Sequence, residues 1–130
     1  MNPLFQQEPI VLDLPDAEII YYPHFMDTIE ADAIFSELKN TIPWQQDEIR
    51  VFGKIHQQPR LTALYGNKDK SYSYSNITMA PNPWIPILDK IKLEVEKICK
   101  TEFTTVLLNY YRDGKDSNGW HADDEKELGE

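Results

Sequence analysis

Three observations predict an α+β fold with two helices packed on one side of a sheet. First, short segments rich in β-branched and aromatic residues outnumber helical ones. Second, two segments carry apolar residues at three- and four-residue spacing, as amphipathic helices do. Third, 130 residues with 41% hydrophobic content are enough to form one domain with a core.

The first third of the chain predicts an extended segment, a strand and a helix. Residues 1–15 contain three prolines and read as an extended lead-in, so we expect the domain itself to span 16–130. Apolar residues then predict a strand over 17–25. The pair Asp27 and Glu30, three residues apart, is typical of a helix N-terminus.

The remainder predicts three strand regions, a second helix and a strong final strand. Residues 48–54 read as a short strand that turns at its glycine, and 59–66 and 71–75 alternate as strands do. An apolar stripe over 84–98 predicts an amphipathic helix entered through three prolines. The segment 104–111 is rich in β-branched and aromatic residues and predicts a strand that leads into a polar, glycine-containing loop.

Charge and cysteine content indicate which partners and which cellular compartment suit the chain. The net charge is −9, but it is uneven: ten acids and two basic residues in 1–50, seven acids and ten basic residues in 51–120. The middle of the chain could therefore face phosphates. Cys99 is the single cysteine and fits a reducing compartment, and no signal peptide or membrane-length apolar run is evident. We expect a cytoplasmic protein that does not enter membranes.

Two pairs of side chains at i, i+2 spacing could carry chemistry. In an extended segment such residues share a face, so His121 and Asp123 could bind one ion. The alternative is a solvated acidic turn. Asn109 and Tyr111 could bind an anion in the same way, or they could be an edge residue and a half-buried strand tyrosine.

The segment "LNYYRDGKDSNGWHADDE" resembles the signature of AlkB-type Fe(II)- and 2-oxoglutarate-dependent dioxygenases, which dealkylate nucleic acids. It contains N-x-Y, a glycine-containing loop and H-x-D-D-E. The stretches "RVFGK", "PRLTALYG", "YSYS" and "APNPWIPIL" resemble the DNA-repair branch of that family. The likeness extends over residues 48–125.

The resemblance implies a fold and a set of roles. The fold would be the N-terminal part of a double-stranded β-helix (jelly roll). His121 and Asp123 would bind Fe(II), and Asn109 and Tyr111 would contact 2-oxoglutarate. The other matched positions would contact the flipped base or the duplex: Val51, Phe52, Gly53, Arg60, Tyr72, Tyr74, Ser75, Asp124 and Glu125.

Physical chemistry is consistent with the implied substrate contacts. Taking a base out of the stack costs a few kcal/mol, and an apolar wedge such as Phe52 can fill the vacated space. Residues 51–80 carry four basic side chains against one acid, so the implied contact segment is basic. Phe52 could instead be an ordinary core residue, and Tyr72 and Tyr74 could serve cross-strand packing.

The implied activity is oxidative demethylation of alkylated DNA, with RNA left open, and N1-methyladenine and N3-methylcytosine as expected lesions. The family pattern also requires a distal histidine, which is not found after Asp123, and neither His24 nor His56 stands where the family places it. We therefore expect the chain to be part of a longer enzyme and to be inactive alone. A dioxygenase acting on protein or a small molecule and a non-catalytic nucleic-acid-binding module are the alternatives. The sequence does not indicate an oligomeric state.

Overall fold

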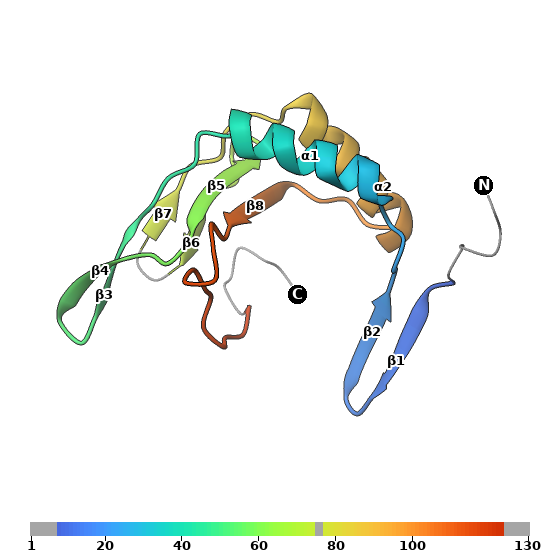
Figure 1. Cartoon of the computed structure of the whole chain (residues 1–130), viewed down its shortest axis with the longest axis horizontal. Coiled ribbons are helices and arrows are strands. Elements are labelled where there is room, and N and C mark those ends of the chain that lie inside the picture. Colours follow the sequence, from blue (N-terminus) through green and yellow to red (C-terminus); the bar gives the residue numbers. More distant parts are fainter. Residues whose placement is uncertain (1–7, 75–76, 124–130) are drawn as a thin grey trace. The chain divides into compact units, whose positions relative to one another are not determined.

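The computed structural model describes residues 8–74 and 77–123. The chain divides after Asn40 into two compact units, and each is described by itself. Figure 1 labels the helices and strands.

The N-terminal unit begins with a β-hairpin. Strands β1 (Ile10–Leu14) and β2 (Ala17–Tyr21) pair antiparallel, with Leu14 opposite Ala17. The turn between them is the two-residue sequence Pro15-Asp16, and Asp16 takes a positive φ of 55°. Residues expected in an extended lead-in therefore form a paired strand. The sequence did not predict this pairing because three prolines obscure a strand pattern.

Helix α1 (Thr28–Thr41) follows β2. Its N-terminus is capped as predicted, because the Asp27 Oδ1 accepts a hydrogen bond of 2.7 Å from the Glu30 backbone N–H. None of its residues is fully buried, and the Phe35 side chain is 56% exposed.

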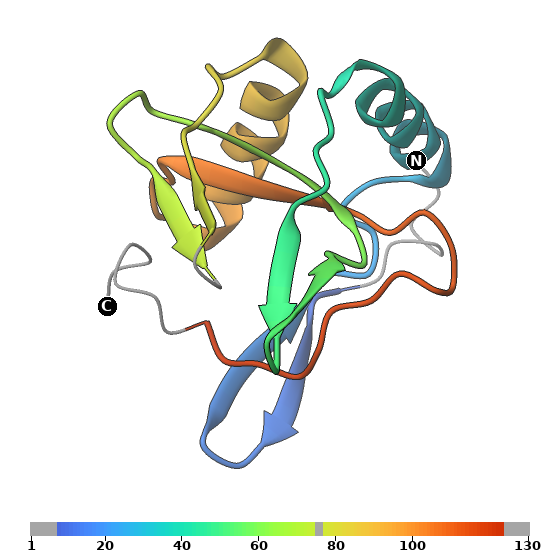
Figure 2. The same cartoon turned by 90° about the vertical axis from the view of Figure 1, so that its left-hand side faces the viewer.

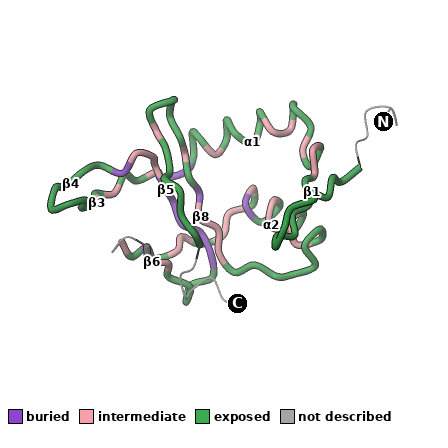
Figure 3. The backbone as a smooth tube through the Cα atoms, turned by 90° about the horizontal axis from the view of Figure 1, so that it is seen from below, coloured by how far each residue is buried: buried purple, intermediate pink, exposed green. Residues whose placement is uncertain are grey.

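The core of the C-terminal unit is an antiparallel pair of strands, β5 (Leu61–Gly66) and β8 (Thr105–Tyr110), shown in Figure 1. Every residue of β5 after Leu61 is buried, and the buried residues follow β5 and part of β8 in Figure 3. The sequence predicted alternating side chains over 59–66, but neither face of β5 is left in solvent, because both are buried. The free edge of β5 is covered by isolated bridges from Gln45 and Asn82, which explains the burial.

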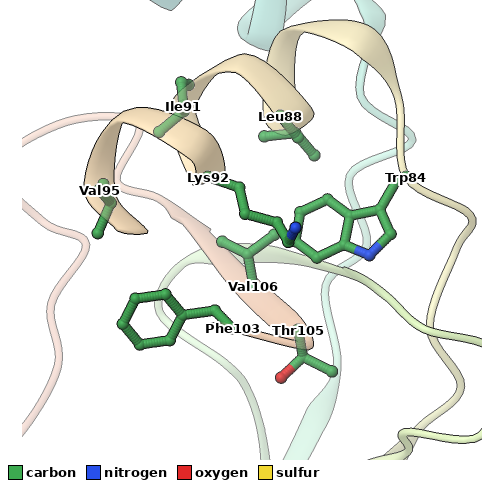
Figure 4. Close-up of a pocket in the computed structure, with 8 residues that line it drawn as sticks. All are labelled: Trp84, Leu88, Ile91, Lys92, Val95, Phe103, Thr105 and Val106. Atoms are coloured by element: carbon green, nitrogen blue, oxygen red, sulfur yellow. The ribbon is translucent and has the colours of Figure 1, made fainter. Parts of the chain in front are cut away.

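Helix α2 (Pro86–Cys99) matches the predicted amphipathic helix. Proline stands at its start, where the missing N–H is no loss, and Lys100 ends it with a left-handed φ of 53°. Its apolar stripe faces β8 across a cavity of about 220 Å³ (Figure 4). The cavity is lined by Trp84, Leu88, Ile91, Lys92, Val95, Phe103, Thr105 and Val106.

Two further hairpins complete the described structure, and Figure 2 shows both. Strands β3 (Glu48–Val51) and β4 (Lys54–Gln57) pair antiparallel, as do β6 (Tyr72–Tyr74) and β7 (Ile77–Met79). The second strand of each hairpin was not predicted as a separate element.

The described residues form a mixed α and β structure with two helices and antiparallel strands, which confirms the predicted α+β composition. Neither of these helices has the length and apolar character needed to cross a membrane.

Candidate active site

The side chains of His121 and Asp123 meet as their spacing predicts. The His121 Nε2 lies 3.3 Å from the Asp123 Oδ1, and the two side chains are 51% and 70% exposed. The other ring nitrogen, Nδ1, lies 2.7 Å from the carbonyl oxygen of Gly119. Because a carbonyl can only accept a hydrogen bond, Nδ1 is the donor in this contact, and Nε2 is the ring nitrogen that faces Asp123.

An imidazole nitrogen and a carboxylate oxygen therefore face each other. An imidazole nitrogen and a carboxylate oxygen at this distance can share a proton or bind a common cation, and imidazole with carboxylate suits Fe(II) or similar ions. The pair fits two positions of such a centre. In the part of the chain that the structure describes, no group of three or more His, Cys, Asp or Glu residues could hold a metal.

The loop between β8 and His121 is held by its own side chains and by its contact with the segment that precedes β5. An ion pair between Arg112 and Asp116 closes the loop. The Ser117 backbone N–H donates to the carbonyl oxygen of Pro59 at 2.8 Å. This hydrogen bond holds the residues that precede His121 against the segment that precedes β5.

Asn109 lies in β8 and Tyr111 directly follows that strand; both side chains are exposed, Tyr111 by 45%. Arg60, which the resemblance placed at the base pocket, contacts Asn109. Its Nε donates to the Asn109 Oδ1 at 3.2 Å, and its Nη1 donates to the Ser117 carbonyl oxygen at 3.2 Å. The structure thus brings Arg60 together with a residue that the sequence assigned to the co-substrate.

Phe52 and Gly53 form the two-residue tip of the β3–β4 hairpin. Both have positive φ, 49° and 77°, as a type I′ turn requires. The Phe52 side chain is fully exposed (101%), and Val51 beside it is 41% exposed. The core alternative for Phe52 is therefore wrong. A left-handed phenylalanine costs about 1–2 kcal/mol, so this ring is presented to solvent at an energetic cost.

Tyr72 lies in β6 opposite Met79 of β7, and its side chain is half-buried. Tyr74 occupies the last position of β6, but its side chain lies outside the described residues. Ser75, Asp124 and Glu125 also lie outside them.

Comparison with known proteins settles the family. Residues 18–130 match the 2OG-Fe(II) oxygenase superfamily. The chain belongs to this superfamily. The resemblance read from the H-x-D-D-E signature is thus confirmed, and Fe(II) and 2-oxoglutarate are the metal and co-substrate that give the superfamily its name.

Relatives within the 2OG-Fe(II) oxygenases are similar over most of this chain. Alpha-ketoglutarate-dependent dioxygenase alkB homolog 3 of Mus musculus is 44% identical over 114 residues, which cover 87% of this chain and 39% of the relative. DNA oxidative demethylase ALKBH2 of Homo sapiens is 42% identical over 102 residues, covering 76% of this chain and 39% of the relative. The chain thus spans about 39% of the length of these relatives.

Sequence reasoning missed several groups that position the candidate site. The carbonyl oxygens of Gly119 and Ser117 orient His121 and Arg60, and backbone carbonyls leave no signal in a residue pattern. The contact between Arg60 and Asn109 joins residues 49 positions apart, and only the pairing of β5 with β8 brings them together.

Proposed function

We propose that the protein containing this chain oxidatively removes alkyl groups from nucleic-acid bases. Membership of the 2OG-Fe(II) oxygenase superfamily supports the reaction type, and relatives named as DNA oxidative demethylases support the substrate class. When bound, Fe(II) and 2-oxoglutarate supply the oxidising power that hydroxylates an N-methyl carbon with O2, giving succinate, CO2, formaldehyde and the unmodified base. N1-methyladenine and N3-methylcytosine in DNA are the proposed substrates, with RNA as a further candidate.

The observation that carries this proposal is the convergence of His121 Nε2 and Asp123 Oδ1, 3.3 Å apart. We propose that these atoms are two of the metal ligands. The hydrogen bond between His121 Nδ1 and Gly119 supports this role because it occupies Nδ1 and orients Nε2 as the nitrogen that would bind a metal. Further ligands would come from parts of the protein outside the described residues.

We propose that Asn109 and Tyr111 hold 2-oxoglutarate. An amide N–H and a phenol O–H are neutral donors suited to a carboxylate, and both side chains are exposed on the segment that leads to the metal loop.

The β3–β4 hairpin tip is the proposed wedge into nucleic acid. The full exposure of Phe52 supports this role, since an apolar ring at a hairpin tip can occupy the space left by a flipped base. The remaining proposed substrate contacts are Val51, Gly53, Arg60, Tyr72, Tyr74, Ser75, Asp124 and Glu125.

We propose that residues 16–130 form the N-terminal part of a jelly roll whose other strands come from the rest of the protein, with both helices on one side. Within residues 8–74 and 77–123, β8 pairs only with β5, and the apolar cavity beside it has room for further side chains. Residues 1–130 alone would be inactive, because His121 and Asp123 are the two metal ligands that we propose among the described residues. The single Cys99 supports a cytoplasmic location.

The test uses the protein that contains this chain with Fe(II), 2-oxoglutarate, O2 and an oligonucleotide bearing N1-methyladenine or N3-methylcytosine. We expect loss of the methyl group by mass spectrometry, together with succinate and formaldehyde. His121→Ala and Asp123→Ala should abolish product, whereas His24→Ala should not, because it removes an exposed imidazole of the N-terminal unit. Full turnover by His121→Ala would refute the proposed metal site.

Two rival functions give different results in the same assays. A dioxygenase for protein or small molecules would form succinate without demethylating either oligonucleotide. A non-catalytic binding module would bind the methylated oligonucleotide in a gel shift without metal, and would show no succinate under any condition.

A further inference from the structure

We propose that Arg60 is a positioning residue for the co-substrate, which it serves by fixing the orientation of the Asn109 carboxamide. This inference rests on the proposed role of Asn109 in binding 2-oxoglutarate. It gives Arg60 a task separate from contact with the base.

The contact itself determines which way the amide points. The Arg60 Nε lies 3.2 Å from the Asn109 Oδ1. A guanidinium has five N–H donors and no acceptor, so only the oxygen of the carboxamide can face it. The Asn109 NH2 group is consequently turned away from Arg60. Among the described residues, the Asn109 side chain forms no other hydrogen bond, and the residue is exposed.

The guanidinium is held at a second point. Its Nη1 donates to the Ser117 carbonyl oxygen at 3.2 Å, and the Ser117 N–H donates to the Pro59 carbonyl oxygen at 2.8 Å. Two donors of a planar, rigid group are thus directed at two oxygens, so the Nε–H cannot turn away from Asn109 without breaking the second bond.

The orientation matters because the proposed ligand is an anion. An asparagine side chain can rotate so that either its oxygen or its NH2 group faces a ligand, and a carboxamide oxygen repels a carboxylate. Arg60 excludes that orientation and presents the NH2 donors in advance, which lowers the cost of binding. Removal of the groups that orient metal-ligating side chains typically weakens affinity about 10- to 100-fold, and we expect an effect at the lower end of that range for the oriented carboxamide.

The test measures binding of 2-oxoglutarate by calorimetry in the whole protein, without O2 and with Mn(II) in place of Fe(II), so that no turnover occurs. We expect Arg60→Met to raise the Kd about tenfold, since methionine keeps most of the stem and removes the donors. Arg60→Lys, whose ammonium group can still donate to the Asn109 Oδ1, should bind more tightly than Arg60→Met. Arg50→Met is the matched control, because it removes an exposed arginine of β3 and should leave the Kd unchanged.

A double-mutant cycle tests whether Arg60 acts through Asn109. Asn109→Ala should weaken binding, and the double variant Arg60→Met, Asn109→Ala should bind no more weakly than Asn109→Ala alone. Effects that multiply in the double variant would overturn the proposal. So would an Arg60→Met protein with wild-type affinity for 2-oxoglutarate and weaker binding of the methylated oligonucleotide alone.

A wrong assignment of Asn109 to 2-oxoglutarate gives a different result from a wrong inference on Arg60. If Asn109→Ala binds 2-oxoglutarate as tightly as the wild type, the proposed co-substrate site is wrong and the inference on Arg60 falls with it. If Asn109→Ala weakens binding but Arg60→Met does not, the co-substrate site stands and only the inference is overturned. Melting temperatures of Arg60→Met and Asn109→Ala that match the wild type establish that the affinities compare folded proteins, and Arg60→Lys is compared in the same way.

Discussion

Arg112 and Asp116 form a bidentate ion pair across the loop that leads from β8 to His121. The Arg112 Nε lies 2.8 Å from the Asp116 Oδ2, and the Nη2 lies 3.0 Å from the Oδ1. The Arg112 backbone N–H also donates to the Oδ2, at 2.9 Å. These hydrogen bonds from Arg112 hold the pKa of Asp116 at about 2, below its ordinary value of 3.8.

This lowered pKa predicts a pH window for the loop. A carboxyl group with a lowered folded-state pKa stabilises the fold fully above its unfolded pKa near 4, and the contribution is lost as pH falls through about 2. We expect an NMR titration of the Asp116 carboxyl carbon to show a midpoint near 2. Asp116→Asn should remove the pH dependence of loop resonances between pH 4 and 2. A midpoint near 4 for Asp116 would contradict the ion pair.

Phe52→Asn should stabilise the protein and impair its proposed activity on duplex DNA. Asparagine adopts the left-handed conformation of a type I′ turn far more readily than phenylalanine, and the exposed ring contributes no packing. We expect a gain of about 1 kcal/mol in the free energy of unfolding, measured by urea denaturation. Phe52→Ala is the control: it removes the ring but keeps the strained φ, so it should lose activity without the same gain. A destabilised Phe52→Asn protein would contradict this account of the turn.

Gly66→Ala should destabilise the β5–β8 pair. A Cβ at Gly66 would lie 2.6 Å from the Thr105 Cγ2 and 2.7 Å from the Thr104 carbonyl oxygen, and the backbone cannot give way without loosening the strand pair. We expect a loss of about 1–3 kcal/mol in the free energy of unfolding. Gly114→Ala is the control, because a Cβ there meets nothing within 4 Å. Equal stability of the two variants would show that the strands separate easily at this end.

Asp27→Ala should weaken the start of α1. The substitution removes the acceptor of the 2.7 Å hydrogen bond from the Glu30 backbone N–H. We expect a loss of about 0.5–2 kcal/mol, measured by denaturation followed by circular dichroism. Asp32→Ala removes an exposed acid within the same helix and should have little effect. A larger loss for Asp32→Ala would mean that net charge, and not the cap, decides the stability of α1.

Much of the fold can be predicted from local patterns. The cap at Asp27, the apolar stripe of α2 and the β-branched run of β8 are each set by neighbours within a few positions. The β1–β2 and β6–β7 hairpins were not predicted as pairs, because pairing depends on a partner strand and on a turn such as Pro15-Asp16.

The sequence by itself determined the superfamily and the candidate metal pair. An H-x-D spacing brings two side chains to one side of an extended segment, and that relation needs nothing beyond local geometry. Only the tertiary structure decided that Phe52 is exposed at a hairpin tip and that Arg60 faces Asn109. Burial and contacts between distant residues depend on which strands pair, and strand pairing is decided by packing across the whole unit.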